Sequence, residues 1–254
     1  MKLMKKMLPV ALMVALFAGC SNQQTNTNTD TNASNTQVES SSNAQNTEVK
    51  EMTGDQLAKI EADNKEKEKY LVIDVRDEEE YDKGHITHAI NISVDDIKED
   101  LNKIEDYKDK SVVLYCNTGN RSGEAAKILV ENGFKDVYNA EGVKEYDYEL
   151  VTFESVLAEE LQEAANEADN VIIDVRDKKD YDKGHLKSAI SIPLDEAETK
   201  INELDVDKDA DIYTYCYSGN KSKEVAQMLT EAGFTNVHNS LDGTKEFDFE
   251  SVQD

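Results

Sequence analysis

The chain has 254 residues and carries 54 acidic against 28 basic side chains, which gives a formal net charge of −26. A surface this acidic repels phosphate backbones and excludes nucleic acid as a general partner. Three cysteines are too few for a disulfide-stapled scaffold, and a mean hydropathy of −0.68 excludes a chain that lives inside a bilayer.

A basic and then apolar segment begins the sequence. Residues 1–6 contain three lysines, and residues 7–19 are uncharged and mostly apolar. This order is typical of a signal peptide, and the apolar run is short for a membrane-spanning helix. The run ends at Phe17-Ala18-Gly19-Cys20, which resembles a bacterial lipobox, although that motif usually has leucine where Phe17 stands. The resemblance implies a signal peptide at residues 1–19 and a lipid on Cys20; an ordinary cleaved signal peptide is the alternative.

Residues 20–49 follow as a low-complexity tether. Between residues 21 and 50, Asn, Gln, Thr and Ser fill 22 of 30 positions, and no aromatic residue occurs. Such a composition cannot offset the entropy lost on ordering, which predicts disorder. We expect the tether to hold an exported protein on the extracytoplasmic side of a bacterial cell membrane.

The remaining sequence contains the same unit twice. Asp74-Val75-Arg76-Asp77 and Tyr81-Asp82-Lys83-Gly84-His85 both recur 100 residues later. Residues 74–93 and 174–193 are identical at 12 of 20 positions. A repeat of this length can form a domain with its own core. We therefore predict one domain at residues 50–149 and a second at residues 150–254.

Each copy alternates strand-like and helix-like segments. Runs rich in β-branched residues predict buried parallel strands at residues 71–73, 111–115, 171–173 and 211–215. An amphipathic helix is predicted after the second strand of each copy, with Gly133 and Gly233 at the helix ends. The pattern predicts the α/β class, with an open parallel sheet and helices on both of its faces in each domain.

A cysteine follows the second predicted strand of each copy, at the end of the strand where open α/β sheets bind ligands. The two loops are Cys116-Asn117-Thr118-Gly119-Asn120-Arg121-Ser122 and Cys216-Tyr217-Ser218-Gly219-Asn220-Lys221-Ser222. A short loop with a central glycine allows backbone N–H groups to point at the sulfur. Together with the helix dipole and the nearby cation, they favour the thiolate. The same loop suits a sulfonate or phosphate-like anion.

The combined pattern of Asp-Val-Arg, Tyr-x-x-Gly-His-Ile/Leu and Cys-x-x-Gly-x-Arg/Lys-Ser resembles the rhodanese (thiosulfate sulfurtransferase) family. The resemblance covers about residues 52–148 and 152–252 and implies two tandem rhodanese-like domains. Many tandem rhodaneses have a catalytic cysteine in the second copy alone, whereas this chain has one in both. A second departure is Lys221, which replaces the loop arginine.

The resemblance implies an enzyme that moves sulfane sulfur from thiosulfate or a related anion, through a cysteine persulfide, to a thiol or cyanide. No cofactor is expected. No metal is expected either, because His85 and His88 have the spacing of metal ligands on a helix but no partner ligands are evident. Cys116 and Cys216 are the predicted catalytic residues. The predicted substrate-binding residues are Asn117, Thr118, Gly119, Asn120 and Arg121 in the first copy and Tyr217, Ser218, Gly219, Asn220 and Lys221 in the second. Because a guanidinium grips sulfonate oxygens in pairs and an ammonium does not, the first site is predicted to use thiosulfate better.

Two other functions stay open at this stage. One is a non-catalytic persulfide carrier or partner-binding module. The other is a cysteine-dependent phosphatase or arsenate reductase, although such loops place five residues between cysteine and arginine, and four separate Cys116 from Arg121.

Residues outside the loops are predicted to be structural. Arg76 and Arg176 are expected to form ion pairs with nearby acids, and His85 and His185 to orient loops through hydrogen bonds. The acidic run at residues 78–80 is expected to be a solvated face. A disulfide between Cys116 and Cys216 is conceivable outside the cell.

Overall fold

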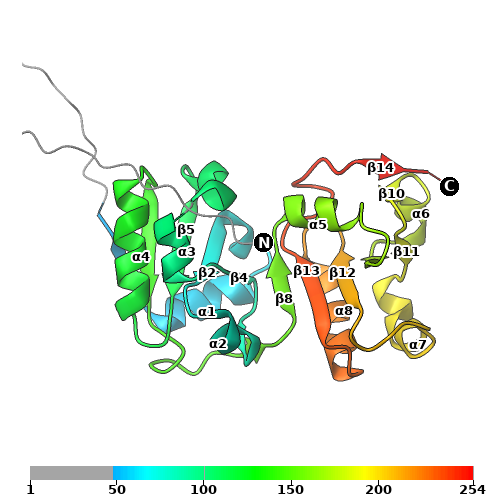
Figure 1. Cartoon of the computed structure of the whole chain (residues 1–254), viewed down its shortest axis with the longest axis horizontal. Coiled ribbons are helices and arrows are strands. Elements are labelled where there is room, and N and C mark those ends of the chain that lie inside the picture. Colours follow the sequence, from blue (N-terminus) through cyan, green and yellow to red (C-terminus); the bar gives the residue numbers. More distant parts are fainter. Residues whose placement is uncertain (1–47, 100, 254) are drawn as a thin grey trace, which may run out of the picture. The chain divides into compact units, whose positions relative to one another are not determined.

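The computed structural model describes residues 48–99 and 101–253 (Figure 1). The predicted signal peptide, Cys20 and nearly all of the tether lie outside the described residues. Within these ranges no helix is both long and apolar enough to span a membrane.

The first copy forms a parallel sheet of five strands in the order β1-β6-β5-β2-β4. Its strands are β1 (Lys50–Met52), β2 (Tyr70–Asp74), β4 (Ala89–Asn91), β5 (Ser111–Tyr115) and β6 (Asp136–Ala140). Its helices are α1 (Gly54–Ala62), η1 (Lys67–Lys69), α2 (Glu78–Asp82), α3 (Val94–Glu99), η2 (Asn102–Tyr107) and α4 (Asn120–Glu131). The two-residue strands β3 (His85–Ile86) and β7 (Leu150–Val151) pair antiparallel in a separate two-stranded sheet.

The second copy repeats this topology with the order β11-β9-β12-β13-β8, again parallel throughout. Its strands are β8 (Glu154–Val156), β9 (Val171–Asp174), β11 (Ile190–Ser191), β12 (Asp211–Tyr215) and β13 (Asn236–Ser240). Its helices are α5 (Ala158–Ala164), α6 (Lys178–Tyr181), η3 (Leu194–Glu196), α7 (Ala197–Asn202) and α8 (Asn220–Glu231). The short strands β10 (His185–Leu186) and β14 (Ser251–Val252) pair antiparallel, as β3 and β7 do.

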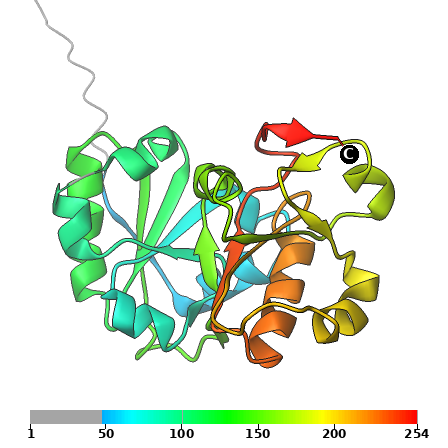
Figure 2. The same ribbon diagram turned by 45° about the vertical axis from the view of Figure 1, so that its right-hand side comes forward.

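Side-chain alternation along the central strands explains why both faces of the sheet carry helices. Leu71 and Ile73 of β2 pack into a cluster with residues of α3 and α4, such as Ile97 and Leu129. Val72 points the other way and packs with residues such as Leu57 of α1. The second copy is divided likewise, and α7 and α8 lie side by side (yellow to orange in Figures 1 and 2). The predicted α/β class and the helices on both faces are confirmed.

The helices after β5 and β12 end where the sequence predicted. Gly133 and Gly233 adopt φ values of +92° and +90°, and the N–H of the following phenylalanine returns to the carbonyl of Leu129 or Leu229. This is a left-handed helix end, which glycine adopts without a steric penalty.

The repeated Asp-Val-Arg segments contain structural ion pairs, as predicted. Arg76 Nη2 donates to Asp74 Oδ2 at 2.6 Å and to the Gly84 carbonyl at 2.8 Å, and both side chains are buried. Arg176 makes the same two bonds to Asp174 and Gly184. Each pair therefore fastens the end of a central strand to the loop that precedes the next short strand.

Candidate active site

Both cysteines lie at the carboxyl end of a central strand. Cys116 directly follows β5, is 1% exposed, and begins the loop that leads into α4. Gly119, immediately before α4, has φ +76°, and its counterpart Gly219 has φ +68°. This left-handed turn at the start of the helix curls each loop back over its own cysteine.

The sulfur of Cys116 is surrounded by hydrogen-bond donors. The Ser122 hydroxyl lies 3.5 Å from Sγ, and the backbone N–H groups of Ser122, Thr118 and Arg121 also stabilise its ionised form. Burial of the thiol opposes its ionisation, but these donors outweigh burial, so the pKa of Cys116 lies below its ordinary value. The arrangement therefore favours the thiolate, as the sequence predicted for this loop.

The hydroxyl of Ser122 has a second acceptor within reach. Asn139 Oδ1 on β6 lies 2.7 Å from Ser122 Oγ. A hydroxyl has one proton, so Ser122 donates to the amide or to the sulfur at any one time. In the second copy Ser222 Oγ lies 3.6 Å from Cys216 Sγ.

The segment after β6 fixes the position of the first loop through backbone contacts. Val143 and Lys144 donate backbone N–H bonds of 3.0 Å to the carbonyls of Cys116 and Asn117. Gly142 approaches so closely that a Cβ atom there would lie 2.3 Å from the Asn117 carbonyl carbon. Gly243 occupies the same place against Tyr217, at 2.2 Å. Only glycine allows this approach without displacing the cysteine loop.

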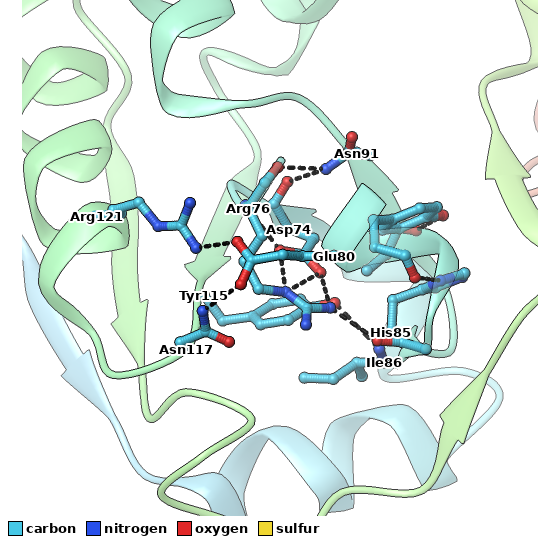
Figure 3. A network of polar contacts seen from close by, with 12 residues as sticks. Asp74, Arg76, Glu80, His85, Ile86, Asn91, Tyr115, Asn117 and Arg121 are labelled. Atoms are coloured by element: carbon cyan, nitrogen blue, oxygen red, sulfur yellow. Dashed lines mark hydrogen bonds and ion pairs between the residues drawn. The ribbon is translucent and has the colours of Figure 1, made fainter. Parts of the chain in front are cut away.

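A carboxylate bridges the two ends of the first loop at its mouth. Glu80 of α2 accepts one bond from Arg121 Nη2 at 2.5 Å and another from Asn117 Nδ2 at 2.7 Å (Figure 3). Asp77 Oδ2 lies 3.3 Å from the other terminal nitrogen of Arg121. The Arg121 guanidinium beside Glu80, helped by the Asn117 amide, lowers the pKa of that carboxyl to about 2.

This bridge corrects the interpretation of residues 78–80 as a solvated face. Glu79 fits that description, with its side chain 87% exposed and paired with Lys83. Glu80 has a side chain 33% exposed, and both of its oxygens are bound by the cysteine loop. Arg121, which the sequence predicted as a substrate-binding cation, thus already has two carboxylate partners.

The mouth of the second loop is arranged differently. Asp180, the counterpart of Glu80, accepts a 2.6 Å bond from the hydroxyl of Tyr217, and it pairs with Lys183 rather than with the loop cation. Lys221 lies 3.2 Å from Asp177. Hydrogen bonds from Lys183 and then Tyr217 lower the pKa of Asp180 to about 2.

The two loops also differ in exposure. Thr118 and Asn120 of the first loop are exposed, whereas Ser218 and Gly219 of the second are buried. Asn220 donates a 3.2 Å bond to Glu68. The first loop therefore has more of its residues exposed to solvent, while Cys116 and Cys216 themselves are equally buried, each 1% exposed.

Two further predictions concern histidine and the cysteine pair. His85 Nδ1 lies 3.0 Å from the Tyr81 carbonyl and its ring stacks on Tyr81, which confirms a structural role. Burial lowers the pKa of His85 to about 4, so the ring is neutral near pH 7. His185 has the same contact with Tyr181, at 3.1 Å.

Cys116 and Cys216 are both free thiols, so the disulfide considered from the sequence is absent among the described residues.

Comparison with known proteins agrees with the repeat. A sequence model described as "Rhodanese-like domain" matches residues 57–146 and 157–249. A thiosulfate sulfurtransferase of Escherichia coli K12, PspE, is 42% identical over 73 residues, which are 29% of this chain and 70% of that protein. A tRNA uridine(34) hydroxylase of Photorhabdus laumondii is 40% identical over 76 residues, but the chain covers 22% of its length. A solved structure described as "rhodanese with anions from E. coli" is 39% identical, with a TM-score of 0.30, and the match covers 32% of this chain and 96% of that one.

Proposed function

Because the chain belongs to the rhodanese-like domain family, with one such domain in each half of its described residues, we propose that it is a thiosulfate sulfurtransferase. In this proposal it takes sulfane sulfur from thiosulfate or a related donor and passes it to a thiol or to cyanide. Cys116 is the principal nucleophile and Cys216 a second one. The proposal needs no cofactor or metal.

The environment of the Cys116 sulfur is the observation that carries this proposal. Donors from Ser122, Thr118 and Arg121 converge on one buried atom and lower the pKa of its thiol. The thiolate forms a bond to the outer sulfur of thiosulfate, the sulfur–sulfur bond of the donor breaks, and sulfite leaves with the electron pair. The resulting persulfide stays inside the same ring of donors until an acceptor removes the outer sulfur.

Steady-state kinetics of the full chain test this function. A covalent persulfide requires sulfite to leave before cyanide reacts, so we expect parallel double-reciprocal lines when both substrates are varied. Thiocyanate and sulfite should form in equal amounts. Intersecting lines would indicate a mechanism without a persulfide, and no thiocyanate at all would favour the carrier or partner-binding alternative.

We further propose that the protein is exported and anchored by a lipid on Cys20, which places the sulfur chemistry outside the cytoplasm. The basic and apolar segment before Cys20 and the polar tether after it support this. Cys20→Ser is expected to shift the protein from the membrane fraction to the soluble fraction. Unchanged sedimentation with membranes would contradict the lipid anchor.

A further inference from the structure

The charges at the mouth of the first loop do not favour the donor that the family name suggests. Arg121 is the one loop cation there, and it faces two carboxylates, Glu80 and Asp77. Arg76, which lies two residues before α2 in the sequence, is paired with the buried Asp74. Among these five residues the three carboxylates outnumber the two guanidinium groups by one.

Glu80 has a stronger influence than Asp77 because it holds both ends of the loop. Its two oxygens accept bonds from Arg121 and Asn117 separately, at 2.5 and 2.7 Å (Figure 3). The side chain of Asp77 is 74% exposed and lies 3.3 Å from Arg121. Arg121 has further N–H donors, but a sulfonate that binds them shares the guanidinium with Glu80 and lies close to its negative charge.

We propose that Glu80 is the specificity-determining residue of the first site, and that by holding Arg121 and Asn117 it disfavours dianionic sulfur donors relative to donors that carry a positive charge. This inference rests on the proposed sulfurtransferase function. Glu80 acts through Arg121 and Asn117 and does not touch the reacting sulfur, so it is a positioning residue. A persulfide that carries an ammonium group, such as that of cysteamine, is attracted by the carboxylate, whereas thiosulfate is repelled by it.

The chemical step is the same for both donors. The Cys116 thiolate bonds to the outer sulfur, the donor's sulfur–sulfur bond breaks, and the electron pair leaves on sulfite or on the cysteamine thiolate. The two donors therefore differ in charge at the mouth and not in the bonds made at Cys116.

Glu80→Gln in a Cys216→Ala background of the full chain tests the inference. Glutamine keeps the shape and one acceptor but removes the charge. We expect KM for thiosulfate to fall about tenfold with kcat little changed, because the sulfonate no longer shares Arg121 with a negatively charged neighbour. With cysteamine persulfide KM should stay the same or rise. The matched control is Glu79→Gln, which removes the same charge from the same helix at a side chain that contacts Lys83 and not the loop; it should leave both KM values unchanged.

Alkylation of Cys116 provides a readout that does not depend on sulfur transfer. Iodoacetate and iodoacetamide share a leaving group and differ in charge. Glu80→Gln should raise the rate with iodoacetate relative to the rate with iodoacetamide at Cys116 by about threefold or more at low ionic strength. Glu79→Gln should leave this ratio unchanged.

The outcomes separate the two proposals. An unchanged alkylation ratio, or an equal fall in kcat for both donors, would show that Glu80 is merely structural and would overturn the inference. A raised alkylation ratio without sulfur transfer from either donor in any variant would support Glu80's role toward anions and contradict the proposed function instead.

Discussion

Cys116→Ala is expected to remove most of the thiosulfate:cyanide turnover, whereas Cys216→Ala should leave most of it. Arg121 keeps N–H donors beyond those bound by Glu80 and Asp77, and a guanidinium can offer two parallel bonds to sulfonate oxygens. Lys221 offers a point charge and is paired with Asp177. A lost charge-assisted bond weakens binding by about 1.5–3 kcal/mol, or roughly ten- to a hundredfold in rate. The measurement is kcat/KM for thiosulfate in the two single variants.

The same two variants also provide the result that would reverse the ranking of Cys116 above Cys216 in thiosulfate turnover. If Cys216→Ala abolishes turnover and Cys116→Ala does not, the second domain is the catalytic one despite its buried loop. Lys221→Arg tests the effect of the loop cation separately from the other differences between the two cysteine loops. It should raise the activity left in Cys116→Ala if the guanidinium is what matters. No gain would point instead to Tyr217, whose hydroxyl is tied to Asp180 at the mouth.

Gly142→Ala is expected to disable the first site by displacing its loop. The added Cβ would lie 2.3 Å from both the carbonyl carbon and the oxygen of Asn117 and 2.5 Å from the Thr118 nitrogen, and backbone atoms cannot swing aside as a long side chain can. We expect a loss of about 1–3 kcal/mol in the free energy of unfolding, as for other overpacked sites. A shift of the loop by about 1 Å should lower turnover by roughly a hundredfold.

Two glycines serve as controls for this variant. Gly133→Ala places a Cβ in open space but strains a residue with φ +92°, so it should cost stability without changing thiosulfate kinetics. Gly243→Ala should act on the second loop alone, through Tyr217 and Ser218. If Gly142→Ala and Gly133→Ala lower stability and kcat/KM in the same proportion, the close approach at Gly142 has no special effect on the site.

The central strands could be predicted because local sequence determines them. The runs at residues 71–73 and 111–115 are rich in β-branched residues and buried except at Ser111, and they lie within β2 and β5. The edge strand β1 and the short strand β3 of the separate two-stranded sheet gave no such signal. β1 buries one residue of its three, and β3 has only two residues, so their extended conformation depends on partners far along the chain.

The site was predictable to the extent that its parts are adjacent in sequence. Cys116, its glycine turn and Arg121 lie in one loop, and the equivalent positions Ser122 and Ser222, and Gly142 and Gly243, were visible in the repeat. Their contacts with the cysteine loop could not be derived from spacing. Glu80 was misassigned because its partner Arg121 is 41 residues away, and an acidic run on a short helix is usually solvated.

Mass spectrometry of the full chain after incubation with thiosulfate tests the central claim most directly. A persulfide adds one sulfur, about 32 Da, to the cysteine that carries it. We predict this addition on the Cys116 peptide, reversed by cyanide, with less on the Cys216 peptide. A chain that releases no sulfite and gains no such mass on Cys116 would contradict the account.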